Sequence, residues 1–388
     1  MNTSLKLSAL AIAIASATSA FAAEPASSLE QALTDGDATL NLRYRFEFVD
    51  QEGLKEAKAS TLKTRLTYET LAYQNASAVL EFDNVTEVLS DDYNSTQNGQ
   101  TKYAVVADPE YTSINQAYLN YAAPAETTVR LGRQLIVLDN QRFVGGVGWR
   151  QNEQTYDALT LINKALPQTT ITASYVAHVK NIFDKDVDAE HTLLNISNTS
   201  LPAGTISAYA YLLKDISDTY GLRFDGKSPM NDITLLYTAE YAMQNADNAA
   251  DNDADYLLGE LGADIKGITA KLGYELQTSD SGAYAFRTPL GTNHAFNGWA
   301  DKFLTTPANG LEDLYVTLST KLAGPNIAVT YHQFDADEGG ANYGDEIDFV
   351  VGQKFGKNYD ATLKLAQYNA EDFSKDTTKV WLMLGAKF

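Results

Sequence analysis

Apolar and polar residues alternate along most of this chain, from about residue 38 to the C-terminus. In the segment TLNLRYRFEFV, the even positions from Leu40 to Phe48 are apolar, and the positions between them are polar or charged. A period of two residues places successive side chains on opposite faces of a strand. Eighteen segments show this pattern, some of them weakly. The alternation therefore predicts an all-β chain whose strands have one apolar and one polar face.

The links between these segments are of two lengths. Short links lie at 72–75, 122–127, 264–267, 323–326 and 356–358, and long polar links cover about 83–112, 135–154, 179–190, 244–254, 278–311 and 334–344. Short turns at one end and long loops at the other are typical of a transmembrane barrel, which must close because hydrocarbon cannot satisfy an unpaired backbone group. We predict an antiparallel up-and-down barrel of about 18 strands. A soluble β-sandwich or β-helix is the alternative, and neither requires this asymmetry.

The two ends of the chain indicate secretion to an outer membrane. Residues 1–22 combine a basic start, an apolar run and a small-residue site ending at Ala22, which predicts a cleaved signal peptide. Residues 23–37 would form a short periplasmic segment and 38–388 the barrel, with both termini in the periplasm. The final strand closes on the aromatic Phe388, as in barrels that the outer-membrane assembly machinery recognises.

The acidic residues, which give a net charge of −21, gather in the predicted long loops. Two D-x-D-x-D runs are weak calcium candidates, formed by Asp184, Asp186, Asp188, Asp251, Asp253 and Asp255. Both runs lack the glycine and the closing glutamate of a calcium loop. Solvated acidic loops are therefore the first interpretation, and weak divalent-ion binding beside lipopolysaccharide is the second. Four histidines and no cysteine give no basis for a zinc site.

The polar face of the strands is predicted to line a water-filled lumen. Its basic members include Arg43, Arg45, Lys63, Arg65 and Arg130. Rows of arginine and lysine favour anions, so this face predicts a path for anionic solutes. Acids share the same face, which leaves a second interpretation open: the charges pair across strands and stiffen the wall.

The link 135–154 contains glycines, arginines and aromatic residues, a composition poorly suited to an exposed loop. Folded into the lumen, it would bring Arg142 and Arg150 to acids of the wall. Eighteen strands leave an aqueous channel by themselves, so a selective pore needs a constriction. We predict that this link supplies it, and that Arg142 and Arg150 pin the loop, contact the solute, or do both. The predicted constriction residues are Arg133, Asp139, Arg142, Phe143, Trp149 and Arg150.

Two motifs resemble a known family. The run GRQ–LDNQRFVG–GW–TYDA at 131–158 and the run AFNGWADKFLTTP–NGLEDLY at 294–315 are similar to the alginate-export family of bacterial outer-membrane proteins. The matching positions are Arg133, Asp139, Arg142, Phe143, Gly145, Trp149, Arg150 and Asp157 in the first motif, and Gly298, Trp299, Asp301, Lys302 and Phe303 in the second. The resemblance implies an eighteen-stranded barrel in the outer membrane of a Gram-negative bacterium and a role in permeation.

The second motif falls in the longest link, 278–311. A salt bridge between Asp301 and Lys302 would lock this link over the mouth of the barrel. In the alternative, the loop forms a sugar-binding patch at the mouth, in which the indole of Trp299 stacks on a sugar ring. The patch would comprise Asn293, His294, Trp299, Asp301 and Lys302.

Together these features predict a passive, porin-like channel for small hydrophilic solutes, leaning toward anionic, sugar-acid or oligosaccharide cargo. The alternatives are a non-conducting surface-binding or structural barrel and a barrel hydrolase. A hydrolase needs a nucleophile, a histidine and an orienting group in one place, whereas the four histidines are scattered and no G-x-S-x-G occurs. We expect no catalytic residue, cofactor or nucleic-acid partner. The expected contacts are solutes, outer-membrane lipid, lipopolysaccharide and the assembly machinery.

Overall fold

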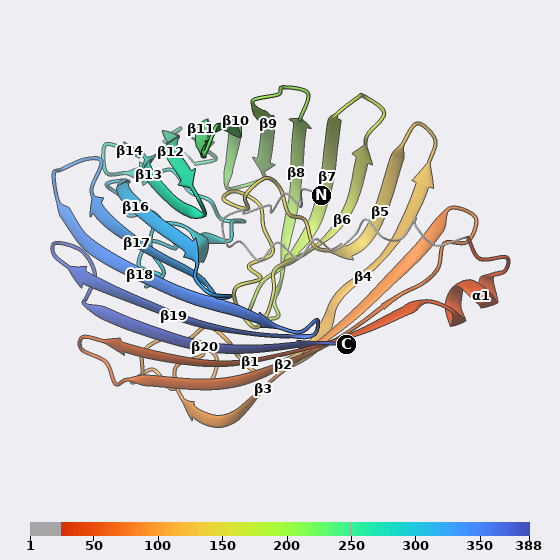
Figure 1. Ribbon diagram of the computed structural model, residues 1–388, viewed down its shortest axis with the longest axis horizontal. Helices are drawn as coiled ribbons and strands as arrows, with labels where there is room; N and C mark the ends of the chain where they lie inside the picture. Colours follow the sequence, from red (N-terminus) through yellow and green to blue (C-terminus); the bar gives the residue numbers. More distant parts are fainter. Residues whose placement is uncertain (1–24, 249) are drawn as a thin grey trace.

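The computed structural model describes residues 25–248 and 250–388, and eighteen of its strands form one closed antiparallel barrel (Figure 1). The barrel strands are β1 (Asp37–Gln51), β2 (Ala57–Glu69), β3 (Ala76–Asp92), β4 (Tyr111–Ala123), β5 (Thr127–Gln134), β6 (Thr155–Asn163), β7 (Thr169–Lys180), β8 (Asp186–Asn198), β9 (Gly204–Leu213), β10 (Ser217–Met230), β11 (Ile233–Ala246), β12 (Asp253–Ile265), β13 (Ile268–Gln277), β16 (Leu311–Lys321), β17 (Asn326–Asp335), β18 (Asn342–Phe355), β19 (Tyr359–Ala370) and β20 (Thr377–Lys387). Consecutive barrel strands pair with each other, and β20 pairs with β1 to close the sheet. The predicted up-and-down barrel is confirmed.

Three small elements lie outside the barrel sheet. The helix α1 (Leu29–Thr34) precedes β1, and Ser28 caps it by accepting a hydrogen bond from the backbone of Gln31. The hairpin of β14 (Ser279–Asp280) and β15 (Tyr284–Ala285) and the short 3-10 helix η1 (Asn293–Ala295) belong to the link between β13 and β16. Among the described residues no helix is long and apolar enough to cross a membrane. The predicted signal peptide, 1–22, lies outside the described residues.

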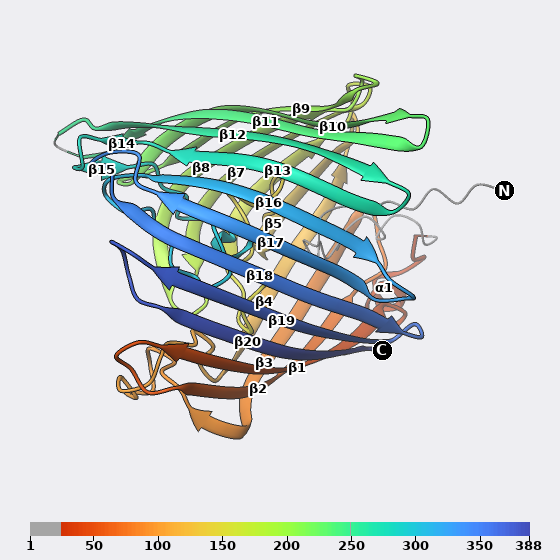
Figure 2. The same cartoon turned by 60° about the vertical axis from the view of Figure 1, so that its left-hand side comes forward.

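The two ends of the barrel differ as predicted. All five predicted short links are turns at the end that carries α1 and the C-terminus, which we call the short-turn end (Figure 2). The long-loop end carries the β3–β4 loop (93–110), the β5–β6 loop (135–154) and the β13–β16 loop (278–310). The predicted link at 83–112 was too long, because β3 continues to Asp92 while paired with β2.

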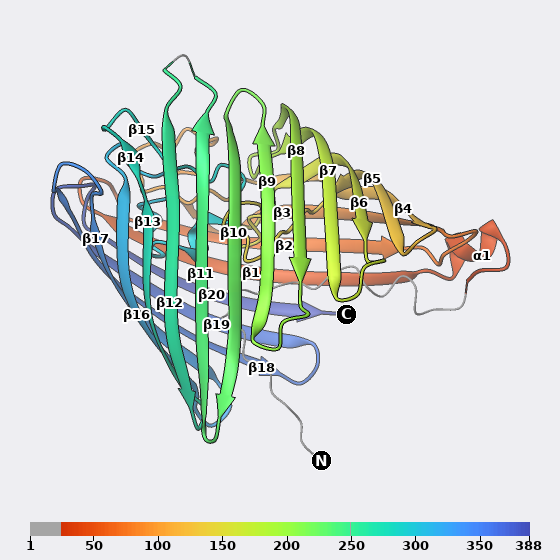
Figure 3. The same cartoon turned by 90° about the horizontal axis from the view of Figure 1, so that it is seen from above.

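The outer face of the barrel is apolar and the inner face is polar, as the alternation predicts. On β20, Leu382 and Leu384 are exposed, whereas Lys379 and Trp381 on the opposite face are buried. Leu131 on β5, with 58% of its surface exposed, belongs to the same outer belt. Figure 3 shows β7 to β13 side by side along one wall. Exposed leucine on every second position is the pattern expected where strands face lipid.

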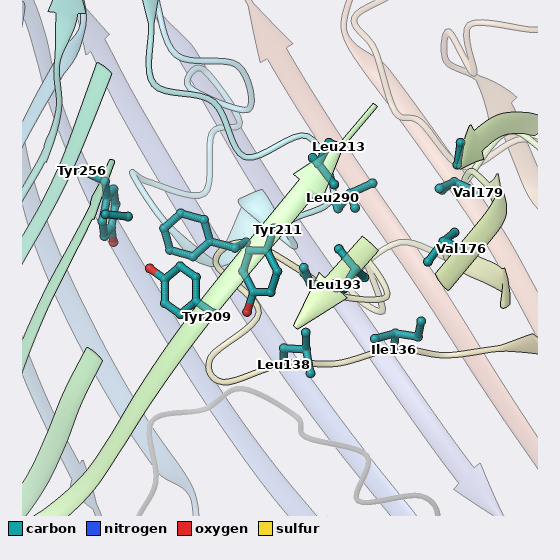
Figure 4. Packing of buried hydrophobic residues seen from close by; sticks show 14 of the residues in the cluster. Ile136, Leu138, Val176, Val179, Leu193, Tyr209, Tyr211, Leu213, Tyr256 and Leu290 are labelled. Atoms are coloured by element: carbon teal, nitrogen blue, oxygen red, sulfur yellow. The ribbon is translucent and has the colours of Figure 1, made fainter. Parts of the chain in front are cut away.

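The core of the molecule lies inside the barrel, where the loops pack on the wall. Figure 4 shows Tyr209, Tyr211 and Tyr256 from the strands beside Leu138 of the β5–β6 loop and Leu290 of the β13–β16 loop. The lumen is therefore partly filled by two of its own loops. The contacts that hold these two loops to the barrel wall therefore determine how much of the lumen stays open.

Inward tyrosines also pack against inward glycines of neighbouring strands. A Cβ added at Gly273 would lie 2.1 Å from Cζ of Tyr315, whereas one added at the outward Gly259 would meet nothing within 4 Å. Because the Tyr315 ring must move, we expect Gly273→Ala to lower the free energy of unfolding by about 1–3 kcal/mol. Urea unfolding in detergent measures this change, and Gly259→Ala is the matched control. Equal midpoints for the two variants would contradict the packing described here.

Candidate channel constriction

The β5–β6 loop crosses the interior of the barrel. Gln151 donates a hydrogen bond to Thr61 Oγ1 on β2 at 2.9 Å and accepts one from Arg43 Nε on β1 at 2.9 Å. From the same loop, Arg142 Nε donates to Glu275 Oε1 on β13 at 2.7 Å. A loop that starts between β5 and β6 can reach both β1 and β13 only through the lumen. Figure 1 draws part of it between the barrel walls.

Arg142 fastens this loop to the far wall and to the β13–β16 loop. Besides Glu275, its guanidinium donates to Asn297 Oδ1 at 2.8 Å, and only 1% of the residue is exposed. The two loops also bond through their backbones, since Gly145 N donates to Leu290 O at 2.9 Å. With its donors occupied inside the protein, Arg142 holds the loop and does not face the passage.

Arg150 has the same role on the opposite side. Its guanidinium lies 3.1 Å from Glu47 Oε2 on β1 and 2.9 Å from Asp301 Oδ2 in the β13–β16 loop. Asp108 of the β3–β4 loop is 3.9 Å away. Burial alone would lower the pKa of Arg150, but these three carboxylates raise it above its usual value. Arg150 is therefore a buried, fully charged pin.

Asp301 joins the two inward loops to the wall. One carboxylate oxygen lies 2.6 Å from His294 Nδ1, and the other lies 2.7 Å from Lys379 Nζ on β20 and 2.9 Å from Arg150. Burial would raise the pKa of Asp301, but Lys379 and His294 hold it well below its usual range. A single carboxylate thus connects three separate parts of the chain.

The predicted salt bridge between Asp301 and Lys302 is wrong. Lys302 Nζ donates instead to Gln51 Oε1 at 3.1 Å, and its pKa is lowered by burial to about 8. The φ of Asp301 is +61°, a turn conformation that directs the two neighbouring side chains to different partners. Trp299 packs inside the lumen, with Lys364 Nζ 3.6 Å from its ring centre, and so does not stand free at the mouth.

Three of the predicted basic wall residues are paired with acids. Arg45 lies 3.1 Å from Asp108. Glu153, at the end of the β5–β6 loop, lies 2.9 Å from Arg65 and 3.4 Å from Lys63. Burial would raise the pKa of Glu153, but Arg65, Lys63 and Arg43 hold it well below its usual range. For Arg45, Lys63 and Arg65 the geometry supports the interpretation in which charges brace the wall.

Arg43 and Arg130 differ from these three. Arg43 donates to Gln151 and to the carbonyl oxygen of Gly148, and no carboxylate of the described residues lies within ion-pair distance of it. Arg130, half-buried on β5, donates from Nε to Asn120 Oδ1 at 2.9 Å, with its guanidinium carbon 4.5 Å from the ring centre of Tyr118. In residues 25–248 and 250–388, no carboxylate lies within ion-pair distance of Arg130. Its terminal nitrogens therefore remain available in the lumen.

Two residues of the first motif, Arg133 and Asp157, lie on the outer face of the barrel and not in the passage. Arg133 is not in the constriction loop: it belongs to β5, on the same face as the exposed Leu131, and bonds Asp157 at 2.8 Å and Asp186 at 2.7 Å. The sequence interpretation failed here because it followed the family motif: Arg133 lies within the expected strand that ends at Gln134, and alternation from the inward Arg130 places it on the outer face. Asp139 and Phe143 do lie inside. Asp139 accepts a hydrogen bond from Asn195 on β8 at 2.7 Å, and Phe143 packs between tyrosines.

The calcium candidates do not converge. Asp186 and Asp188 lie in β8, and Asp253 and Asp255 in β12, so these four belong to strands and not to loops as expected. Alternate residues of a strand are about 6.5 Å apart, too far to form one calcium loop. Within the part of the chain that the structure describes, no group of three or more histidine or acidic side chains is placed to hold a metal ion.

Asp108 and Glu153 were not predicted as site residues. Each sits at the C-terminal end of a long link, shortly before a strand begins. For Glu153, the nearby loop residue Arg150 was a signal in the sequence, whereas no arginine stands near Asp108. The partners of both acids lie tens of residues away, which the sequence does not reveal.

Charges of opposite sign dominate different arcs of the inner wall. The adjoining strands β19, β20, β1 and β2 carry Lys364, Lys379, Arg43, Arg45, Lys63 and Arg65. The strands β11, β13, β16 and β18 carry the buried acids Glu240, Glu275, Asp313, Glu346 and Asp348.

Comparison with known proteins agrees with this architecture. The profile of the family described as alginate export matches residues 36–281, more than half of the chain. No curated protein sequence matches this chain. Among solved structures, Acinetobacter baumannii OccAB4 is similar with a TM-score of 0.76 at 15% identity, covering 90% of this chain and 97% of that one. Pseudomonas aeruginosa OccK9 (OpdG) gives 0.76 at 14%, covering 91% and 98%. Pseudomonas aeruginosa OpdK with vanillate gives 0.73 at 14%, also covering 91% and 98%.

Proposed function

Because this chain belongs to the alginate-export family of outer-membrane barrels, we propose that it is a passive channel for small hydrophilic solutes, with a preference for anions such as sugar acids. The β5–β6 loop narrows the bore, and solutes diffuse past it down their gradients. Diffusion of this kind requires no cofactor and no catalytic residue.

The observation that carries the anion preference is the availability of Arg130. Most lumen arginines are neutralised by carboxylates, whereas Arg130 has only an amide and an aromatic ring as partners. Stacking on Tyr118 holds its guanidinium in place, and a planar guanidinium binds carboxylates with two parallel hydrogen bonds. Vanillate, named with the similar OpdK structure, is a carboxylate and fits the same chemistry.

We assign the short-turn end to the periplasm, together with both termini. The exposed Phe388 then lies where the assembly machinery would recognise the last strand. The acids on the outer face near the long loops, such as Asp186 and Asp188, would lie at the level of lipopolysaccharide.

Flux into liposomes tests the anion preference. We expect Arg130→Gln to lower the ratio of galacturonate flux to galactose flux by about twofold to fivefold, as ~0.5–1 kcal/mol for a partly exposed ion pair predicts. Arg133→Gln removes the same charge from the outer face and should leave the ratio unchanged. An unchanged ratio in Arg130→Gln would remove Arg130 from the solute path. Absence of flux in the unaltered protein would favour a non-conducting surface-binding barrel.

A further inference from the structure

All three tryptophans of the chain contact His294 or Lys364 inside the barrel. The ring of Trp149 in the β5–β6 loop stacks on His294 at 3.9 Å with an interplanar angle of 6°. Trp381 on β20 meets His294 edge-on at 5.7 Å. Lys364 Nζ on β19 lies 3.6 Å from the ring centre of Trp299 and 3.9 Å from that of Trp149. We call these residues the tryptophan cluster.

The hydrogen bonds of His294 define its protonation. Lys364 Nζ lies 2.9 Å from Nε2, and Asp301 Oδ1 lies 2.6 Å from Nδ1. In the state in which Lys364 is an ammonium it can only donate, so Nε2 accepts and carries no proton. The proton then sits on Nδ1 and points to Asp301. His294 is neutral in this arrangement and links the β13–β16 loop to β19.

The charges around this site are balanced while His294 is neutral. Lys302 and Asp301 come from the same loop, and the other elements packed here contribute Arg150, Asp108, Arg45, Glu47, Glu346, Asp348, Lys364 and Lys379. The cations and the acids among these residues are equal in number. A proton added at Nε2 would be an extra charge directed at the Lys364 ammonium.

We propose that His294 is an acid-sensitive latch: its protonation separates it from Lys364 and releases the β13–β16 loop from the wall, which widens the passage. The first half of this inference concerns only the loop, and the second half rests on the proposed channel function. Two cations 2.9 Å apart in a site with little water repel each other strongly. Because the backbone of Lys364 is held in a barrel strand, we expect the part of the loop that carries His294 to move.

The direction of the pH dependence follows from the environment of His294. Burial lowers its pKa well below the usual value, although Asp301 opposes this shift. A group whose pKa is lowered in the closed state stabilises that state above its ordinary pKa, near 6.5. This contribution is lost as the pH falls toward the lowered pKa. The latch is therefore closed at neutral pH and opens in acid.

Tryptophan fluorescence of the refolded full chain tests the loop movement directly. We expect emission to shift to longer wavelength as the pH is lowered from about 7.5 to about 4. This range extends from above the ordinary pKa of histidine to well below it. His294→Gln keeps a donor and an acceptor but does not titrate, so the shift should be lost. His178→Gln, on the outer face beside Asp188, should retain it. A shift that persists in His294→Gln, or no shift in the unaltered protein, overturns the latch.

Conductance across the same pH range tests the second half. We expect larger single-channel currents in acid for the unaltered protein and for His178→Gln, and constant currents for His294→Gln. A fluorescence shift without a change in current would overturn the gating of the passage by the latch. A protein that shows the fluorescence shift and never conducts would instead refute the proposed channel function.

Discussion

Asp301→Ala is expected to release both inward loops and to lower the free energy of unfolding by about 3–5 kcal/mol, the cost of breaking a buried ion pair from one side. The carboxylate is 6% exposed and lies between Arg150, Lys379 and His294. Without it, two cations and a histidine face one another in a site with little water. Because Arg150 holds the β5–β6 loop, that loop should detach along with the β13–β16 loop. Single-channel conductance should therefore rise.

Urea unfolding and planar-bilayer recording measure the two effects of Asp301→Ala. Asp255→Ala is the matched control, since that acid lies on the outer face, where its side chain accepts a hydrogen bond from Tyr241 OH at 2.9 Å. It should change neither quantity. A variant that loses stability but keeps its conductance would show that these loops do not limit the passage.

Glu153→Gln is expected to shift the ion selectivity of the pore toward anions. Glu153 neutralises Arg65 and Lys63 and accepts a hydrogen bond from Asn115 at 3.0 Å. Glutamine removes the charge and leaves two cations that share Asp83 and Glu81. Fixed positive charge in a pore favours anions. The unfolding free energy should fall by roughly 3 kcal/mol, near the lower limit for a broken buried pair, because Asp83 still binds both cations.

The reversal potential under a salt gradient measures this shift. Glu190→Gln provides the control, since Glu190 pairs with Lys214 at an exposed position outside the lumen. It should leave the reversal potential unchanged. A shift toward cations in Glu153→Gln would mean that the basic arc of the wall does not face the conducting path.

The barrel could be predicted from the sequence because its physical rule is local. Lipid on one side and water on the other impose a two-residue period, which is visible in segments such as the one from Leu40 to Phe48. The ends of strands were harder to place. β3 and β8 continue past the apolar belt, where the alternation fades but backbone pairing persists.

The site could be predicted only in outline. The composition of the link 135–154 indicated an inward loop, and Arg142 and Arg150 do lie among acids. The partners of these arginines could not be found, because Glu275 and Asp301 lie more than a hundred residues further along the chain. Arg133 was misplaced for another reason. It belongs to the strand expected to end at Gln134, and alternation from the inward Arg130 already places it on the outer face.

Single-channel recording of the refolded protein in planar bilayers, with the reversal potential under a salt gradient, tests directly whether the protein is an anion-preferring channel. We expect an open pore that is selective for anions at neutral pH, and we expect this selectivity to weaken in Arg130→Gln. A cation-selective pore would mean that the acids of the barrel control entry. A protein that inserts into the bilayer and passes no current would contradict the channel altogether.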